Sequence, residues 1–323
     1  MKLDIIRDEV IVAYDRINGF VHHTSLIKSH TLSELISGQV FLKCENEQVT
    51  GSFKARGSLN KILSINEKER SQGMITASTG NHALGFSRAL ALTNTKGTVF
   101  LPNKASEAKV KALSHFPVDL ERYGDDSLST ELYAKENAKS TNSIWMSPYN
   151  DLQVIAGQGT IGVEILQEIE NVDAVLATVG GGGLISGVGG YMKSVLPNIE
   201  VIGCQPENSP EMTLSLEAGE IVDLPEFIET LSDGSAGGIE PNAITFSICQ
   251  EIIDKSILVS ENEIKEGIRH IFHFHKKVIE GAAGVAVASL QKNIDHFKGK
   301  TVVIILCGSN IESKKFVDIV NEN

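Results

Sequence analysis

Short apolar runs alternate with segments of helical spacing along most of the chain. Runs that read as strands occur at residues 40–45, 74–78, 98–102, 173–180 and 301–309. Between them lie stretches such as NHALGFSRALAL, in which apolar residues recur at helical spacing. Strands that are apolar on both faces and joined by helices are typical of parallel sheets covered on both sides. The pattern therefore predicts an α/β protein with mostly parallel sheets.

The alternation falls into two blocks, one nested inside the other. Residues 73–150 contain four short apolar runs with helical segments between them, which is enough for a compact unit. We predict a large domain from residues 1–72 and 151–323 and a small one from residues 73–150, each a three-layer αβα unit. Ligands in such folds bind where strands end, usually in the cleft between domains. The loops that leave the strands are therefore the candidate sites of chemistry.

Composition narrows the class of partner. The chain has 323 residues and a formal net charge of −12, so binding to nucleic acid or to anionic membranes is disfavoured. The amino-terminal segment is charged and amphipathic rather than a signal peptide, and no apolar run is long enough for a bilayer, so we expect a cytoplasmic protein. The four cysteines lie far apart without a C-x-x-C pair, which argues against zinc or a disulfide framework.

The loop TVGGGGLISG, residues 178–187, follows an apolar strand and opens a helix. Exposed backbone N–H groups at a helix start favour an anion, and a phosphate is the natural guest. A dinucleotide fingerprint fails here, because its third glycine position falls on Ile185. A tight strand–helix turn is the simpler alternative, but four consecutive glycines cost more backbone entropy than packing requires. We therefore favour phosphate binding.

The loop ASTGNHALG, residues 77–85, is a second strand-to-helix turn. Ser78, Thr79 and Asn81 offer hydroxyls, an amide and N–H groups at a helix start, a set that suits a carboxylate. An ordinary helix cap by serine or asparagine explains the same residues equally well.

Lys54, in GSFKARG, lies at the start of a predicted helix that Ser52 could cap. A cation at the positive end of a helix is electrostatically misplaced, which lowers the pKa of an amine and makes it a better nucleophile and base. A surface lysine is the simpler alternative. Cys307 falls where the last apolar run ends, and a small buried hydrophobe is its simpler interpretation. Together the four loops suggest a phosphate-bearing aldehyde bound to lysine, as in pyridoxal phosphate chemistry on an amino acid.

The chain resembles the fold type II, or tryptophan-synthase-like, pyridoxal-phosphate enzymes, and within them the serine/threonine dehydratase and serine racemase branch. The matching segments run in order over nearly the whole chain: SFKARG, STGNHA, VIAGQGTIGVEIL, VGGGGLISG, SDGSAGGIE, EGAAGVA and LCGSNI. The resemblance implies pyridoxal 5′-phosphate in the cleft between a large domain and a small mobile one, and a homodimer.

The resemblance also implies roles for individual residues. The cofactor aldehyde is held by Lys54, the two faces of its ring by Phe53 and Gly234, and its ring hydroxyl by Asn81. The expected phosphate contacts are Gly180, Gly181, Gly182, Gly183 and Leu184. The expected substrate-carboxylate contacts are Ser78, Thr79, Asn81 and His82. Glu280, at the start of EGAAG, receives no role.

Three positions refine the expected reaction. Cys307 faces the pyridine nitrogen in the resemblance; a neutral partner does not hold that nitrogen protonated, which favours loss of a β-leaving group over transamination. Thr79 replaces the serine that serves the opposite face of Cα in serine racemases, so we expect racemisation as a side activity at most, with Thr79 as a candidate catalytic residue. The divalent-cation site of the branch has Gln205 in place of a carboxylate beside Ser209 and Glu211, and no metal is assigned.

The expected activity is dehydration and deamination of L-threonine or L-serine to a 2-oxo acid and ammonia. The same fold could act on another β-hydroxy amino acid, such as 3-hydroxyaspartate, a phenylserine or a hydroxyectoine-derived acid, as a dehydratase or a racemase. A non-catalytic amino-acid-binding protein is a remote alternative that the retained Lys54 disfavours. The chain ends soon after LCGSNI, so we expect no regulatory domain and no feedback control by isoleucine.

Overall fold

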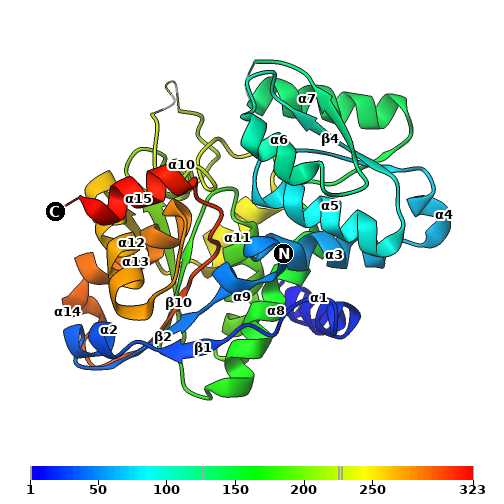
Figure 1. Ribbon diagram of the computed structural model, residues 1–323. Helices are drawn as coiled ribbons and strands as arrows, with labels where there is room; N and C mark the ends of the chain where they lie inside the picture. Colours follow the sequence, from blue (N-terminus) through cyan, green and yellow to red (C-terminus); the bar gives the residue numbers. More distant parts are fainter. Residues whose placement is uncertain (1, 126, 225, 227, 323) are drawn as a thin grey trace.

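The strands form two separate sheets in the computed structural model, which describes residues 2–125, 127–224, 226 and 228–322. Figure 1 shows the larger sheet at the lower left and the smaller one at the upper right. Within the two sheets of the described residues, every strand pairing is parallel except that of the first two strands, so the predicted α/β class with mostly parallel sheets is confirmed.

The larger sheet has the strands of the amino-terminal and carboxyl-terminal parts of the chain side by side. Its order is β1 (Leu26–Lys28), β2 (Gln39–Lys43), β10 (Thr301–Ile305), β7 (Ala174–Thr178), β8 (Glu200–Pro206) and β9 (Lys255–Val259). The short antiparallel edge strand β1 has no clear sequence signature, since the three residues Leu-Ile-Lys are too few to show a period.

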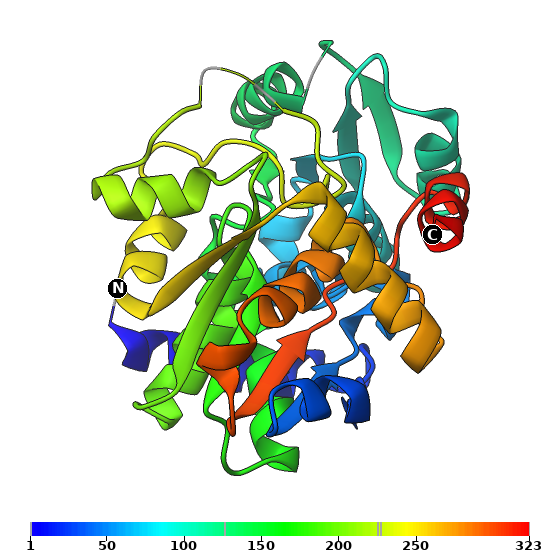
Figure 2. The ribbon, with the colours of Figure 1, turned by 90° about the vertical axis from the view of Figure 1, so that its left-hand side faces the viewer.

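Helices cover both faces of the larger sheet (Figures 1 and 2). On one side lie α1 (Leu3–Ile17), α8 (Leu152–Glu168), α9 (Gly183–Val195), α10 (Glu211–Ala218) and α11 (Ile244–Ile252). On the other lie α2 (His30–Leu35), α12 (Glu261–His275), α13 (Gly281–Lys292), α14 (Ile294–Phe297) and α15 (Ser313–Asn321). None of the helices in the described part of the chain is long and apolar enough to cross a membrane.

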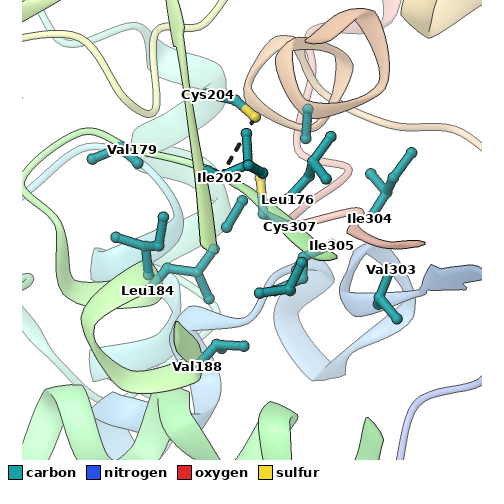
Figure 3. Close-up of a cluster of buried hydrophobic side chains, with 14 of the residues drawn as sticks. Leu176, Val179, Leu184, Val188, Ile202, Cys204, Val303, Ile304, Ile305 and Cys307 are labelled. Atoms are coloured by element: carbon teal, nitrogen blue, oxygen red, sulfur yellow. Dashed lines mark hydrogen bonds between the residues drawn. The ribbon is translucent and has the colours of Figure 1, made fainter. Parts of the chain in front are cut away.

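The apolar core of the larger unit includes the carboxyl end of β10 and the residues just after it. Figure 3 shows apolar side chains of β7, β8 and β10 packed with those of α9, and Leu176, Ile202 and Ile304 represent the three strands. Cys307 lies in this cluster, just beyond β10, and is buried. The carboxyl end of β10 is therefore fixed by apolar packing.

The smaller sheet is built from residues that are contiguous in the sequence. Its order is β5 (Asp119–Arg122), β4 (Gly97–Leu101), β3 (Met74–Ala77) and β6 (Ile144–Trp145). The surrounding helices are α4 (Glu67–Arg70), α5 (Asn81–Thr93), α6 (Glu107–Leu113) and α7 (Ser127–Ser140). All four strands fall within residues 73–150, while the exact domain boundaries stay a prediction.

Helix α3 (Lys54–Ser64) joins the two units, because it packs against both α5 and α8. It follows two short 3₁₀ turns, η1 (Glu45–Glu47) and η2 (Val49–Gly51). Its first residue is Lys54, so the fold sets the candidate lysine at the junction of the two sheets.

Four buried charges anchor α3 to the larger unit. The Arg56 guanidinium donates to both carboxylate oxygens of Glu45, at 2.8 Å each, and to both of Glu164, at 2.6 and 2.9 Å. The Lys43 amine lies 2.6 Å from Glu164 Oε2. All four side chains are buried. Two cations balance two anions, so the group as a whole is neutral in the protein interior.

We predict that Arg56→Met destabilises the protein by about 3–5 kcal/mol, because it leaves two buried carboxylates with one cation between them. Urea unfolding followed by circular dichroism measures the loss. The matched control is Lys139→Met, which removes an exposed 3.4 Å pair with Glu136 and should change the free energy of unfolding by less than about 0.5 kcal/mol. Equal effects of the two substitutions would contradict this account.

Candidate active site

The Lys54 side chain reaches from the start of α3 toward the smaller sheet. Its Nζ donates a hydrogen bond of 2.8 Å to the carbonyl oxygen of Pro148, which follows β6. Burial lowers the pKa of the amine to about 8, while the nearby Cys307 and Glu280 act in the opposite direction. A substantial fraction of Lys54 is therefore neutral near physiological pH, as a nucleophile or a general base requires.

One detail of the predicted Lys54 environment is wrong. Ser52 does not cap the helix: the N-cap residue is Phe53, without a side-chain bond, and the Ser52 hydroxyl is buried with no partner among the described residues. The lowered pKa of Lys54 agrees with the direction expected from the sequence, and its largest cause is desolvation by burial.

Ser52 instead contributes through its backbone. It forms an isolated bridge with Gly308, and the Phe53 N–H donates to the Cys307 carbonyl at 3.1 Å. These contacts fasten the lysine loop to the end of β10. They bring Lys54 and Cys307 together, although the two residues are far apart in the sequence.

The glycine loop links β7 to α9. The backbone of Gly182 has a φ of +86°, which favours glycine. A Cβ at Gly181 would lie 2.5 Å from the Tyr149 ring, and one at Gly180 would lie 2.7 Å from the Ser235 carbonyl oxygen. Glycines are therefore needed because two other segments pack directly on the loop.

The start of α9 leaves donors for an anion. The bond from Ser186 N–H to the Gly182 carbonyl, at 2.9 Å, is the first of the helix. The N–H groups of Gly183, Leu184 and Ile185 precede it and have no acceptor within the helix. This geometry suits a phosphate, in agreement with the chemistry that the sequence predicts for residues 180–184.

The STGN loop has a similar form between β3 and α5. Gly80 is the N-cap residue and no side chain caps the helix, so the helix-cap alternative does not describe this turn. Ser78 Oγ accepts from the Gly80 N–H at 3.2 Å, and the first bond of the helix runs from Leu84 N–H to the Gly80 carbonyl. The N–H groups of residues 81–83 are left without acceptors in the helix, as a carboxylate site requires. Thr79 lies in this turn and is partly buried.

The His82 imidazole points into the smaller unit rather than into this turn. It is buried, and its Nε2 lies 2.9 Å from Thr76 Oγ1. Burial, with Lys54 nearby, lowers its pKa to about 3, so the ring is neutral. Any contact of His82 with a substrate carboxylate would therefore come from its backbone N–H.

Glu280, to which the sequence assigned no role, is bonded directly to a predicted site residue, Asn81. Its carboxylate is buried and accepts from Asn81 Nδ2 at 2.8 and 3.0 Å and from the Asn310 N–H at 3.1 Å. Asn310 Nδ2 in turn donates to Asn81 Oδ1 at 2.6 Å. Glu280 thus holds the amide that the resemblance places on the cofactor hydroxyl.

Gly308 makes room for the Glu280 carboxylate, because a Cβ there would lie 2.6 Å from its Oε1. A Cβ at Gly234 would lie 3.7 Å from the same atom, which is an ordinary contact distance. Burial raises the pKa of Glu280 to about 7. The signal for Glu280 in the sequence was its place at the start of EGAAG. Its partners Asn81 and Asn310 lie 199 and 30 positions away in the sequence.

The remaining predicted residues lie around Lys54. The Phe53 ring centroid is 5.2 Å from Lys54 Nζ. The Cys307 thiol is buried, and desolvation together with Glu280 raises its pKa well above the usual range, so it stays a neutral thiol.

This set of residues fits pyridoxal phosphate. A desolvated amine lies at the junction of the two sheets, N–H groups without acceptors in their helix can hold the phosphate, and a neutral thiol lies just beyond β10. The protein-family model described as "Pyridoxal-phosphate dependent enzyme" matches residues 17–308 of this chain. The chain belongs to this family. It is therefore a pyridoxal-phosphate-dependent enzyme whose candidate cofactor lysine is Lys54.

Sequence relatives lie among threonine-degrading lyases. The chain is 37% identical over 319 residues to the catabolic L-threonine dehydratase TdcB of Escherichia coli (strain K12), covering 98% of this chain and 96% of that one. It is 38% identical over 321 residues to the L-threonine ammonia-lyase of Thermotoga maritima, covering 98% of this chain and 79% of that one.

Solved structures with the same fold include both lyases and racemases. Threonine deaminase isoform 2 of Solanum lycopersicum superposes with a TM-score of 0.92 at 30% identity, covering 98% of this chain and 87% of that one. Serine racemase of Dictyostelium discoideum superposes with a TM-score of 0.88 at 33% identity, covering 97% and 99%. The relatives confirm fold type II and leave the substrate open.

We predict that Glu280→Gln abolishes a pH dependence of stability in the cofactor-free protein. With a pKa of about 7 in the folded state and 4.5 as its ordinary value, Glu280 keeps a proton in the folded chain that the unfolded chain releases. The contribution of Glu280 to the free energy of unfolding should therefore fall as pH rises from 4.5 to 7, by on the order of 3 kcal/mol. Buried His82 contributes with the opposite sign in both proteins, so the quantity to compare is the difference between wild type and Glu280→Gln at each pH. Urea unfolding across this range measures it.

The exposed Glu136→Gln substitution is the control and should keep the wild-type pH profile. If Glu280→Gln and wild type show parallel profiles, the carboxylate does not hold the proton assigned to it.

Proposed function

We propose that the enzyme removes water and then ammonia from L-threonine or L-serine, releasing a 2-oxo acid. The observation that carries the proposal is the partly neutral Lys54 amine at the junction of the two sheets, beside the neutral Cys307 thiol. The identity of more than a third to two threonine-degrading lyases over nearly the whole chain supports it.

The two N–H-lined turns divide the binding work. The turn at residues 180–184 binds the cofactor phosphate, and the turn at residues 78–82 binds the substrate carboxylate through N–H groups. The two turns belong to different sheets, so the cofactor and the substrate together are held across the junction. Lys54, the first residue of α3, lies at the same junction.

Lys54 moves the proton. Its neutral Nζ accepts the α-proton of the substrate, and loss of the β-hydroxyl with a proton completes the elimination of water. When bound, pyridoxal phosphate supplies an electron-withdrawing ring that stabilises negative charge at Cα. The released enamine hydrolyses to a 2-oxo acid and ammonia.

Cys307 favours elimination over transamination. A thiol with a strongly raised pKa cannot supply the negative charge that would keep a pyridine nitrogen protonated. Negative charge at Cα is then stabilised less strongly, so prompt departure of the β-hydroxyl is favoured. Glu280, through Asn81, holds the amide assigned to the ring hydroxyl in place.

Racemisation is the second candidate activity. A specific observation favours it: the fold is shared with serine racemase of Dictyostelium discoideum and with a pyridoxal 5′-phosphate-dependent aspartate racemase at 33% identity each. Thr79 occupies the turn from which a second proton carrier would act, but its methyl group narrows the approach. We therefore propose racemisation as a side reaction at most.

A homodimer, a cytoplasmic location and movement of residues 73–150 stay predictions.

We predict that Lys54→Ala lowers formation of 2-oxo acid from serine or threonine by about 10³-fold or more, because proton transfer alone contributes about 10²–10⁴-fold. It should also lose the absorbance that borohydride removes from the cofactor-loaded enzyme. Lys139→Ala, on the exposed surface, should keep both properties. A Lys54→Ala enzyme that still deaminates serine at the wild-type rate would disprove the mechanism.

We predict that L-threonine and L-serine give the highest kcat/KM in a panel of β-hydroxy amino acids that includes both enantiomers of each. The assay measures 2-oxo acid and ammonia, and chiral chromatography of the remaining substrate measures racemisation. Preference for 3-hydroxyaspartate or a phenylserine would replace the proposed substrate class while keeping the chemistry. Racemisation faster than elimination would reverse the assigned order of the two activities.

A further inference from the structure

The turn that follows β8 is the place where the dehydratase and racemase branch is expected to hold a divalent cation. Gln205 is the last residue but one of β8, and Ser209 and Glu211 occupy the other expected ligand positions. All three side chains are buried. Their hydrogen bonds decide whether a cation fits.

The orientation of the Gln205 amide follows from its partners. Its Oε1 accepts from the Thr213 N–H and from Thr213 Oγ1, at 2.7 Å each. A backbone N–H can only donate, so the oxygen of the amide must face Thr213. The Nε2 group therefore faces the Ser209 carbonyl oxygen, at 3.3 Å.

Two further oxygens of the turn accept hydrogen bonds from protein donors. Glu211 Oε2 accepts from Ser209 Oγ at 2.6 Å, and Ser209 Oγ accepts from the Gly237 N–H at 3.2 Å. A divalent cation such as Ca²⁺ or Mg²⁺ needs oxygen ligands. One bound at the Ser209 carbonyl would meet the N–H groups of Gln205, so the residues do not fit a divalent cation.

The same turn is connected to the candidate active site. Gly237 lies in the SDGSAGG loop, which also contains Gly234 and Ser235. The Ser235 carbonyl oxygen would lie 2.7 Å from a Cβ on Gly180, so this loop packs directly on the glycine turn. Whatever holds Ser209 in place therefore also holds one wall of the phosphate site.

We infer that Gln205 is a positioning residue whose amide takes the structural place of a divalent cation. Its donor end fastens the Ser209 carbonyl and its acceptor end fastens Thr213, which fixes the turn from both sides. Through Ser209 and Gly237 the amide also supports the SDGSAGG loop. The fold and activity of this enzyme are therefore independent of divalent cations, whichever β-hydroxy amino acid it uses.

If the Gln205 amide replaces a cation, the substitution Gln205→Glu should restore a cation site. The new carboxylate can still accept from Thr213, but it loses the donor to Ser209 and adds a negative charge beside Glu211. The turn then has three oxygen groups facing one another and should bind Ca²⁺ or Mg²⁺. The cation should repair the loss that the substitution causes.

The experiment uses the cofactor-loaded enzyme with EDTA, with millimolar CaCl₂ and with millimolar MgCl₂. Thermal unfolding and isothermal titration calorimetry are the readouts, and neither depends on activity. Wild type should show the same Tm in all three solutions and no heat of Ca²⁺ binding. Gln205→Glu should unfold earlier in EDTA and regain about 5 °C or more with Ca²⁺ or Mg²⁺, as a ligand at 100 times its Kd would give.

Gln205→Leu is the matched control, because it removes the amide without adding a ligand: its Tm should fall and no cation should restore it. Binding of Ca²⁺ or Mg²⁺ to wild type, with a rise in Tm, would overturn the inference. So would a Gln205→Glu enzyme that binds neither cation. The wild-type titration keeps the test decisive if Gln205→Glu does not fold in EDTA. Failure of the proposed reaction leaves these unfolding results unchanged, so the two proposals are tested separately.

Discussion

The position of Lys54 depends on the pairing of its loop with the end of β10. The Phe53 N–H bonds the Cys307 carbonyl, and Ser52 bridges Gly308. Arg56, two residues after Lys54, is bonded to two buried carboxylates of the larger unit, those of Glu45 and Glu164. The backbone of Lys54 is thus fixed on both sides, while its Nζ bonds the carbonyl oxygen of Pro148, which follows β6 of the smaller sheet. Desolvation at this junction lowers its pKa and gives the lysine its chemistry.

Burial also sets the protonation of two other groups in the candidate site, Cys307 and Glu280. The thiol of Cys307 is kept neutral, and the carboxyl of Glu280 gains a pKa near the working pH of most enzymes, about 7. The anion-binding turns differ, because they act through backbone N–H groups that do not titrate. The site therefore combines titratable groups tuned by desolvation with fixed dipoles, and the two kinds of group lie on different loops.

Local features of the fold and site could be predicted from the sequence, and long-range ones could not. The apolar runs predicted the strands β3, β4, β7 and β10, and the four glycines predicted the turn between β7 and α9, because both signals depend on neighbouring residues. Anion binding by that turn stays a prediction. The cap by Ser52 was wrong, since its hydroxyl is buried instead.

Glu280 was missed because its contacts with Asn81 and Asn310 exist only once distant segments have folded together. The anchor formed by Lys43, Glu45, Arg56 and Glu164 is hidden for the same reason: each charge, taken alone, looks like a surface residue. The family resemblance supplied the roles that spacing could not, while the Gln205 hydrogen bonds depart from the cation site which that resemblance implies.

The most direct test of the central claim is the pKa of Lys54 in the cofactor-free protein. Nitrogen-15 NMR of lysine-labelled protein measures it, and the signal is assigned by its absence in Lys54→Arg. Burial at the junction predicts a titration midpoint of about 8. A midpoint at the ordinary value of 10.5 would mean that the amine is solvated, and it would contradict the account.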